Sequence, residues 1–444
     1  MANEADRNEI FKRTDAAGVR QVGLQFTDVL GVAKTVTVPV DLLPDALDGN
    51  VLFDGSSIQG FARVEEADMF LNPDPATFAV FPWVSAGPPT ARFICDIRRP
   101  DNTPYPGCPR TALKRVLAAV GERGFCLRVA PEVEFFLFDR DERGRATTHT
   151  EDQAGYFDLA PVDRGEQVRQ DMVGVLEQMG IRVAASHHEV APGQHEIDLA
   201  PQDALMAADQ LVTLRTVVRE VARQAGLHAT FMPKPVAGIN GSGLHLHCQL
   251  EREGDNAFFD AGATDSLSSI GRAFLAGLLQ HAGGFALVTN PLVNSYKRLV
   301  PGYEAPIYIG WSRRSRSPMV RLATDRGQNP RLELRSPDPA CNPYLALSAI
   351  AAAGLDGIEA GLEPPPQVAH NVHRLRDTER AEIGVRRLPA SLDEAIARFR
   401  DDGVVQAALG AELSQSLTEA KRIEWDVYRT AVHPWEIDQY LTVY

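Results

Sequence analysis

Cysteine is scarce in this sequence and never occurs in a paired pattern. The chain has five cysteines in 444 residues, and no two of them form a C-x-x-C pair. This spacing excludes a disulfide framework and a cysteine-based zinc site. It predicts buried thiols in a reducing compartment.

Long hydrophobic runs are also missing. No stretch approaches the ~18 consecutive apolar residues of a membrane-spanning helix. The first 15 residues are polar and charged, unlike a secretory signal peptide. We therefore expect a cytoplasmic protein without a membrane partner.

Positive charge is in the minority. The chain has 45 Lys and Arg against 59 Asp and Glu, so its net charge is −14 at pH 7. Sequence-independent binding of nucleic acid needs a basic surface, so no nucleic-acid partner is expected. The hydrophobic content of 44% is typical of a globular chain with a large core.

The common glycine motifs of nucleotide-binding proteins are missing as well. The sequence has no Walker A motif, and its Gly238–Gly243 segment does not fit the Rossmann pattern. Any use of a nucleotide must therefore depend on another scaffold.

A turn-rich segment at residues 98–109 is the best candidate for a domain boundary. Two stretches before it, 21–26 and 34–38, have the alternation of strands. After it, helical spacing occurs at 110–124 and 204–225 and in the last ~60 residues. Asp163 and Glu166 predict a capping box that opens a further helix, which ends at Gly180. We predict domains at 1–104 and 105–444.

Four short predicted strands in the second domain carry charged groups on one face. Because side chains alternate along a strand, Glu132 and Glu134 point the same way, as do Glu196 and Asp198. The other two strands show the same pattern at His245, His247 and Gln249, and at Arg331, Glu333 and Arg335.

An antiparallel sheet with one wet face is the ordinary explanation for any one of these strands. Taken together, the faces are almost purely Glu, His and Arg. Acids that converge on one space repel one another unless cations lie between them. An oxygen-rich set with one imidazole suits Mg²⁺ or Mn²⁺ better than zinc.

Arginines form a second group. Seven of them lie between residues 313 and 335, and Arg298 lies just upstream. Arg313 and Arg314 are equally well explained as part of a solvated loop. The others alternate with apolar residues, which predicts a structured site. Metal-binding carboxylates beside guanidinium groups suit the handling of a polyphosphate.

Longer motifs make the interpretation specific. Seven segments resemble the bacterial type I glutamine synthetases, in order and over essentially the whole chain. They are Phe53–Ile58, Pro131–Phe136, Ser186–Ile197, Met232–Pro235, Gly241–His245, Asn294–Pro306 and Asn342–Leu345.

This resemblance implies an α+β fold. An N-terminal β-grasp-like domain would precede a catalytic domain whose curved antiparallel sheet forms an active-site funnel. The chain would form a homo-oligomer, a dodecamer of two stacked hexamers with active sites between subunits. The implied activity is the ATP-dependent ligation of ammonia to L-glutamate through a γ-glutamyl phosphate intermediate.

The resemblance also implies roles for particular residues. Two or three Mg²⁺ or Mn²⁺ ions would be held by Glu132, Glu134, Glu189, Glu196, His245 and Glu333. The glutamate substrate and the transferred phosphoryl group would contact Asn240, Gly241, Arg298, Arg316 and Arg335. ATP would contact His247, Arg321 and Arg331.

Ammonium would bind in an anionic pocket. In the resemblance, Asp54 reaches into the neighbouring subunit as the base, and Tyr156 and Glu189 complete the pocket. Ammonium has no lone pair, so a carboxylate must both bind it and remove a proton. Glu304 would lie on a flap that keeps water from the acyl phosphate.

The sequence departs from the family pattern at a few positions. These are Gln59, Gln249, Ser315 and Ala323, none of which is an implied metal ligand. His373 stands where some members carry a tyrosine that is adenylylated, so that control is not expected, as in the unadenylylated alpha-like subtype. Arg63 matches a position that is tied to glutamine feedback.

Two alternatives stay open. One is a ligase of the same superfamily that joins glutamate to a polyamine or another amine. The other is a non-catalytic homologue with a regulatory or structural role. The intact set Asp54, Tyr156 and Glu189 favours ammonia, and the intact metal set favours catalysis. Regulatory protein partners are not predicted.

Overall fold

The computed structural model describes residues 3–56, 58, 68–83, 87–325, 328–368, 372, 377–382 and 385–444. The predictions at Gln59, Arg63 and His373 lie outside these residues. The described chain is built around two main hydrophobic cores, the smaller in the first 108 residues and the larger mainly in residues 112–417.

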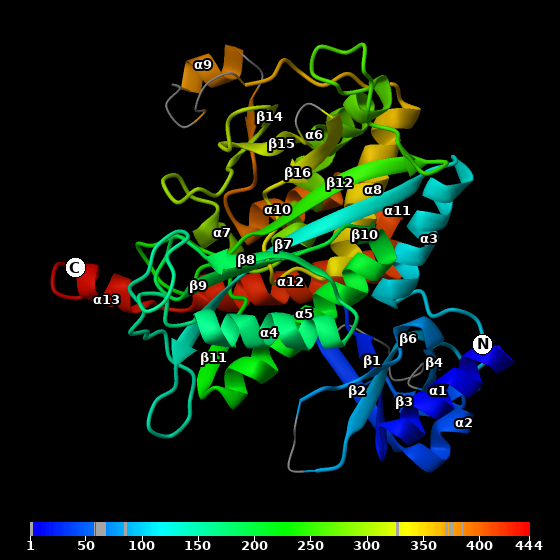
Figure 1. Ribbon diagram of the computed structural model, residues 1–444. Coiled ribbons are helices and arrows are strands. Elements are labelled where there is room, and N and C mark those ends of the chain that lie inside the picture. The colour runs from blue at the N-terminus through cyan, green and yellow to red at the C-terminus, as the bar shows by residue number, and fades with distance from the viewer. Residues whose placement is uncertain are drawn as a thin grey trace.

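The N-terminal part is a β-grasp domain, as expected. Its six-stranded sheet has the order β2-β1-β6-β4-β3, with β5 beside β6, and lies below the larger part in Figure 1. Strands β1 and β6 are parallel, and the other pairs are antiparallel. The elements are α1 (Glu4–Ala16), β1 (Gln21–Thr27), β2 (Ala33–Pro39), α2 (Leu43–Leu47), β3 (Val51–Asp54), β4 (Asp68–Pro73), β5 (Ala79–Val80) and β6 (Thr90–Arg98).

The second part contains an 11-stranded sheet with the order β17-β14-β15-β16-β12-β7-β9-β8. Its strands are β7 (Cys126–Asp139), β8 (Val183–His188), β9 (Gln194–Leu199), β10 (Gln202–Asp203), β11 (Leu227–Thr230), β12 (Leu244–Arg252), β13 (Asp255–Asn256), β14 (Tyr308–Ser312), β15 (Pro318–Asp325), β16 (Gln328–Leu334) and β17 (Arg386–Arg387). All pairs are antiparallel except β14 with β15, which is a departure from the fully antiparallel expectation.

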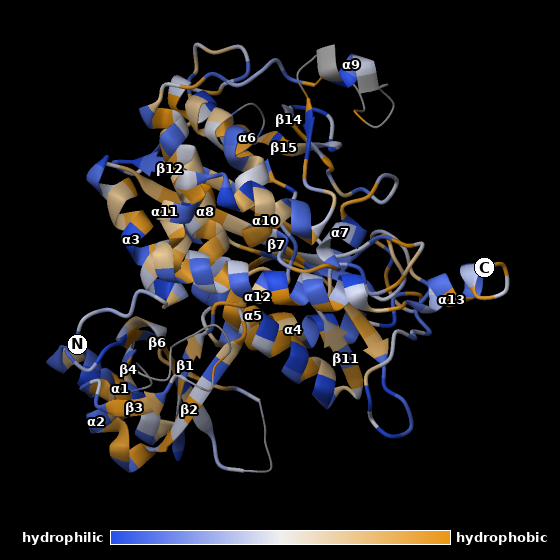
Figure 2. Cartoon of the chain, turned by 180° about the vertical axis from the view of Figure 1, so that it is seen from behind, coloured by the Kyte–Doolittle hydropathy of each residue, from blue (hydrophilic) through white to orange (hydrophobic). Residues whose placement is uncertain are grey.

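Helices cover this sheet, and the long strands β7 and β12 run across the middle of the molecule (Figure 1). They are α3 (Pro109–Glu122), α4 (Glu166–Gln178), α5 (Ala204–Gln224), α6 (Ser269–Thr289), α7 (Ser295–Arg298), α8 (Pro343–Glu359), α9 (Asp377–Glu382), α10 (Leu392–Arg400), α11 (Gly403–Leu409), α12 (Ala411–Thr430) and α13 (Pro434–Tyr440). In Figure 2, hydrophobic residues concentrate on the inner strands and helices, and α12 turns mostly hydrophilic residues toward the viewer. Within the described chain, no helix has the length and apolar character to cross a membrane.

Helices α6 and α8 approach each other at glycine. A Cβ added at Gly277 would lie 2.1 Å from the carbonyl oxygen of Ala353, and one at Gly357 would lie 2.1 Å from that of Ala273. No side chain fits at such distances, so glycine at both positions allows the backbones to pack directly. Residues of both helices belong to the same hydrophobic core as the large sheet.

Strand alternation sets which residues face the core. In β12, Leu244, Leu246 and Leu250 are at most 1% exposed and belong to the larger core. The intervening His245 and His247 therefore project from the opposite face of the sheet. The predicted polar face is the face that positions the site.

Two local predictions were wrong. Helix α4 begins at Glu166 after Gly165, without a capping box. Asp163 instead accepts a hydrogen bond from the Gly165 amide and pairs with Arg169 of the same helix, so its carboxylate does not cap the first turn. Cys126 is exposed, whereas the other four cysteines are buried as predicted.

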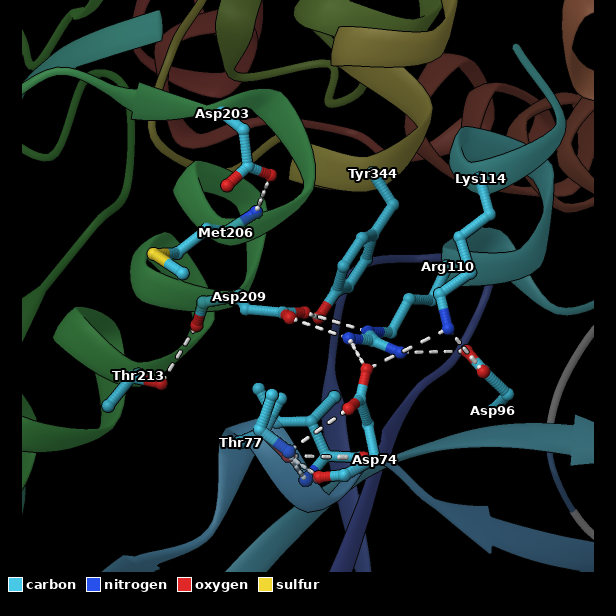
Figure 3. A network of polar contacts seen from close by, with 12 residues as sticks. Asp74, Thr77, Asp96, Arg110, Lys114, Asp203, Met206, Asp209, Thr213 and Tyr344 are labelled. Atoms are coloured by element: carbon cyan, nitrogen blue, oxygen red, sulfur yellow. Dashed lines mark hydrogen bonds and ion pairs between the residues drawn. The ribbon is translucent and has the colours of Figure 1, made fainter. Parts of the chain in front are cut away.

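The two parts are joined by a polar network around Arg110, which is 3% exposed (Figure 3). From α3, its guanidinium donates to Asp74 and Asp96 of the β-grasp part at 2.7 and 2.9 Å. It also donates to both oxygens of Asp209 on α5, at 2.9 and 2.8 Å. Tyr344 of α8 donates to the same carboxylate at 2.7 Å. One buried cation thus connects the two parts.

Candidate active site

A cavity of about 470 Å³ opens at the polar face of the large sheet. All six predicted metal ligands line it: Glu132, Glu134, Glu189, Glu196, His245 and Glu333. Eight other predicted site residues also line it: Tyr156, Asn240, Gly241, Arg298, Glu304, Arg316, Arg321 and Arg335. The structure therefore brings most of the predicted site together.

The pairing of the strands places the acidic groups side by side. Across β7 and β9, Glu134 lies opposite Glu196 and Glu132 lies opposite Asp198. Across β7 and β12, Glu132 lies opposite His245. Because paired residues share a face, this register carries the acids into one volume.

One half of the cavity is electrically compensated. Arg335 donates to Glu333 at 2.5 Å, and Arg321 pairs with the other oxygen of the same carboxylate. Burial opposes ionisation of Glu333, but these arginines and the nearby His245 and His247 outweigh it and lower its pKa. Glu333 is therefore ionised at neutral pH.

Glu132 is compensated by two histidines. Its carboxylate lies 3.0 Å from Nδ1 of His245 and 2.5 Å from Nε2 of His247. Burial raises the pKa of Glu132, but the hydrogen bonds from both imidazoles outweigh burial and hold it well below its usual range. Glu132 is an anion held between two rings.

The other half of the cavity is not compensated. Burial, followed by the charge of Glu134, raises the pKa of Glu189 to about 8. Burial and the neighbouring acids, Glu134 first, raise the pKa of Glu196 to about 12. Burial and Glu132 raise the pKa of Asp198 to about 7. These carboxylates repel one another and favour a bound proton or cation.

This donor set fits divalent cations of the magnesium type. Carboxylate oxygens with one or two imidazoles are the ligands that Mg²⁺ and Mn²⁺ accept. Glu132, His247 and Glu333 lie close enough to hold one ion, and so do His187, Glu196 and Asp198. A cation would also remove the repulsion described above.

Arg298 is buried at the base of the cavity and is 3% exposed. It donates to the carbonyl oxygens of Ser336 at 2.8 Å and Arg335 at 3.1 Å, which fixes its guanidinium. A Cβ at Gly243 would lie 2.7 Å from Nη2 of Arg298 and 3.1 Å from Glu134. Glycine is thus required beside this guanidinium.

The mouth of the cavity carries Tyr156 and Glu304. The hydroxyl of Tyr156 is hydrogen-bonded to Arg316, and burial and the charge of Glu189 raise its pKa. Glu304 accepts a hydrogen bond from the side chain of Asn240 at 3.3 Å and has φ +62°, a strained conformation for a glutamate. Both groups are available to a bound substrate.

Three predicted site residues lie outside the cavity lining. Asp54 is exposed at the end of β3, where hydrogen bonds from the Ser56 hydroxyl and then from the Ser56 amide lower its pKa. Arg331 pairs with Asp325 at 2.7 Å and donates to Nδ1 of His247 at 3.3 Å. His247 is thus turned toward Glu132 and Arg331, beside the cavity.

Six lining residues were not assigned to the site: His187, Val190, Gln194, Asp198, Tyr303 and Ala305. The alternation had placed Asp198 on the face of Glu196 without giving it a role, and the same period-2 pattern could have found Gln194. Gln194 donates to Glu134 at 2.7 Å and to the carbonyl of Gly241 at 3.2 Å.

Comparison with known proteins agrees with this geometry. The family profile described as "Glutamine synthetase, catalytic domain" matches residues 106–440, and "Glutamine synthetase, beta-Grasp domain" matches residues 18–100. A glutamine synthetase of Thermus thermophilus is 51% identical over 440 residues, 98% of this chain and 99% of the relative.

Solved structures agree as well. A structure titled "GmaS/ADP complex-Conformation 1" superposes with a TM-score of 0.88 at 33% identity, covering 98% of this chain and 99% of that one. The Plasmodium falciparum glutamine synthetase superposes with a TM-score of 0.87 at 27% identity, covering 99% of each chain. The chain belongs to the glutamine synthetase family, and its full-length similarity to bacterial members places it in bacterial type I.

Proposed function

We propose that this protein is a glutamate–ammonia ligase, which converts L-glutamate, ammonium and ATP into L-glutamine, ADP and phosphate. The observation that carries the proposal is the cavity itself, where uncompensated carboxylates face four arginines. Such a site can hold cations on one side and phosphate oxygens on the other. About 50% identity to curated glutamine synthetases over the full chain supports the same activity.

We assign the metal ions to the residue sets that the family resemblance implies. Glu134, Glu189 and Glu196 would hold one divalent cation, either Mg²⁺ or Mn²⁺. Glu132, His245 and Glu333 would hold a second cation, and the site would bind two or three ions in all. When bound, such ions polarise phosphoryl oxygens and screen charge.

The arginines would act in the phosphoryl-transfer step. A carboxylate is a poor electrophile, so the γ-carboxylate of glutamate first takes the γ-phosphoryl group of ATP. Arg298, Arg316 and Arg335 would bind the glutamate carboxylate and the charge that develops on the phosphoryl group. Asn240 and Gly241 would bind the amino-acid end of glutamate.

ATP would lie along β15 and β16. Arg321 and Arg331 would neutralise its phosphates, and His247 would contact the nucleotide. Arg331 and His247 already touch at 3.3 Å, which supports a shared role beside the cavity. The register keeps these groups on one face of the sheet, because Arg321 and His247 both lie opposite Glu333 and Arg331 is two residues from Glu333.

Ammonium would bind near Glu189 and Tyr156, and Asp54 would remove its proton. Asp54 is exposed at the end of β3 and lies outside its own chain's cavity lining, which supports a role in the site of a neighbouring subunit. Glu304, hydrogen-bonded to Asn240 at the mouth, would close over the γ-glutamyl phosphate and exclude water.

We further propose a homo-oligomer, a dodecamer of two stacked hexamers with shared active sites, located in the cytoplasm. The domain boundary is placed between residues 104 and 105, in the segment that connects β6 with α3. Feedback by glutamine through Arg63 is part of this proposal.

The decisive experiment measures phosphate release with ammonium and with a panel of amines, each with and without glutamate. Release that requires both glutamate and ammonium supports the proposal. A preference for a polyamine or another amine would favour the γ-glutamyl-amine ligase. No release with any combination, in the presence of Mg²⁺ or Mn²⁺, would favour a non-catalytic homologue.

A further inference from the structure

A buried polar cluster lies behind the wall of the cavity that carries Glu189 and Glu196. Its members, each at most 6% exposed, are Asp152, Asp163, Arg169, His188 and His195. The aspartates and histidines lie close enough together to hold a metal ion. The cluster contains its own cation, however, because Arg169 sits among them.

Arg169 of α4 contacts two of these groups. Its Nη1 lies 2.8 Å from Nδ1 of His195 and 2.8 Å from Oδ2 of Asp163. Asp163 also accepts from the amide of Gly165 at 2.9 Å, and a Cβ at Gly165 would lie 2.4 Å from the ring of His195. His195 is therefore held in place from two sides.

Each histidine is the neighbour of a carboxylate in the cavity. His195 lies in β9 between Gln194 and Glu196, which both line the cavity, so its ring points to the opposite face. His188 is the last residue of β8 and directly precedes Glu189. A shift of either ring would move a predicted metal ligand.

Asp152 ties together both ends of the turn that carries Glu189. Its Oδ2 accepts from Nε2 of His188 at 2.6 Å and from the amide of Gly193 at 2.8 Å. Nδ1 of His188 donates to the carbonyl oxygen of Glu189 at 2.6 Å. One carboxylate thus sets the geometry of the turn between β8 and β9.

The same cluster supports Tyr156. The amide of Ala154 donates to Oδ1 of Asp152 at 3.0 Å, and the amide of Phe157 donates to the carbonyl oxygen of His188 at 3.1 Å. The backbone on both sides of Tyr156 is therefore attached to the cluster. The residues proposed for ATP lie on β12, β15 and β16, on the other side of β7.

We propose that Asp152, His188, Arg169, Asp163 and His195 are positioning residues for the metal and ammonium half of the active site. They act through Glu189, Glu196 and Tyr156 and leave the ATP half in place. This inference rests on the proposed function, because that function gives the three cavity residues their roles. Partners behind metal ligands orient them and set their affinity.

The test replaces Asp152→Asn. The amide keeps the size of the side chain but has only one oxygen. Asp152 accepts at Oδ2 from His188 and Gly193 and at Oδ1 from Ala154, so in the variant the NH₂ group must face at least one of these N–H groups. We expect the KM for ammonium and the half-saturating Mn²⁺ concentration to rise roughly 10–100-fold. The KM for ATP should stay within about twofold of wild type, because the residues proposed for ATP lie on the other side of β7. Calorimetric titration with Mn²⁺ measures the metal effect without turnover.

The matched control is Asp356→Asn, which changes a similar Asp–His pair. Asp356 lies 3.0 Å from Nε2 of His281, between α8 and α6 and away from the cavity. We expect it to leave all three constants unchanged. A second variant, Arg169→Lys, keeps the charge but cannot bridge His195 and Asp163 in the same way, and it should shift the same constants as Asp152→Asn.

Equal rises in the KM for ammonium and ATP would overturn the inference, as would a loss of kcat alone. Failure of both variants to fold would also overturn it, because the cluster would then support the whole fold. Wild-type protein without ammonium-dependent phosphate release would contradict the proposed function. Active wild type with unshifted variants would contradict the positioning role alone.

Discussion

Single residues in the cavity divide into two electrostatic kinds. Glu333 has two guanidinium partners, whereas Glu196 lies among other acids, with Nε2 of His187 3.3 Å away. A bound proton or cation would relieve the repulsion around Glu196. In the metal-free protein, Glu196 therefore lowers the stability of the fold at a position where the proposed function requires a metal ligand.

Replacing Glu196→Gln should separate stability from function. The raised pKa of Glu196 means that the folded protein takes up a proton that the unfolded chain at pH 7 does not bind, which costs stability. The neutral amide should therefore raise the Tm of metal-free protein and weaken Mn²⁺ binding at least about tenfold. Thermal melts in chelator and calorimetric titration measure these effects.

The control for that variant is Glu142→Gln, at an exposed carboxylate in the loop after β7. It should change neither quantity. A fall in the Tm of metal-free Glu196→Gln would show that the acidic group is compensated after all.

Gly243→Ala tests the close packing beside Arg298. The new Cβ would lie 2.7 Å from Nη2 of Arg298 and 3.0 Å from Nε2 of His245, so one of them must move. We expect a loss of about 1–3 kcal/mol of unfolding free energy and a raised KM for glutamate. Urea unfolding and steady-state kinetics measure the two effects.

A second glycine gives the opposite expectation. Gly174 lies inside α4 with no atom within 4 Å of an added Cβ. Gly174→Ala should therefore stabilise the protein by about 0.5–1 kcal/mol without changing KM. Equal effects of the two substitutions would contradict the steric argument.

At the scale of elements, the strands were the most predictable part. The alternation of Glu132 and Glu134 with apolar residues predicted a one-faced strand, and β7 alternates in burial up to Glu132 but is buried throughout from Val133 to Phe138. The pairing that brings Glu196 opposite Glu134 could not be read from spacing, because it depends on contacts between distant segments. The capping box at Asp163 failed for a local reason, because its carboxylate accepts from the Gly165 amide and pairs with Arg169.

Side-chain partners were also beyond the reach of the sequence. His247 was assigned to the nucleotide, and the structure shows it 2.5 Å from Glu132. Nothing in the spacing of β12 distinguishes His245 from His247, since both share one face. Only the arrangement of neighbouring strands decides which acid each ring meets.

The helices α6, α8 and α11 meet around His281, where pH should act on stability. Burial lowers the pKa of this imidazole, but the hydrogen bonds that the ring donates to Asp402 at 2.9 Å and Asp356 at 3.0 Å outweigh burial and raise it. Folding therefore favours the protonated ring. Its contribution is fully present below the unfolded pKa of about 6.5 and is lost as pH rises through the higher folded value.

The measurement compares His281→Gln with wild type by thermal melts between pH 5 and pH 9. We expect the wild type to exceed the variant in Tm at low pH and the difference to shrink as pH rises. A difference that grows with pH would reverse the sign and contradict the ion pair.

At the scale of the whole molecule, Arg110 connects the two hydrophobic cores (Figure 3). Arg110→Met would leave the buried Asp209 without its cation, and the half-buried Asp74 and Asp96 with Lys114 alone. Removing one partner of a buried ionic group costs about 3–5 kcal/mol. We expect a loss of that size in urea unfolding, together with faster proteolysis between β6 and α3.

The control is Arg145→Ala, which breaks an exposed pair with Asp141 at 2.7 Å. Exposed pairs contribute about 0–1 kcal/mol, so this variant should behave almost as wild type. A loss below about 1 kcal/mol for Arg110→Met would show that the network is dispensable to the fold.

The pairing of β7 has a consequence for how such genes can change. Two predicted ligands, Glu132 and Glu134, sit on one strand paired with β12 and β9. Insertion or deletion of one codon upstream of them within β7 would turn both acids toward the interior and bring Val133 into their place. In an alignment of related sequences, we therefore expect insertions and deletions in the surface loop after β7 and none within the strand itself.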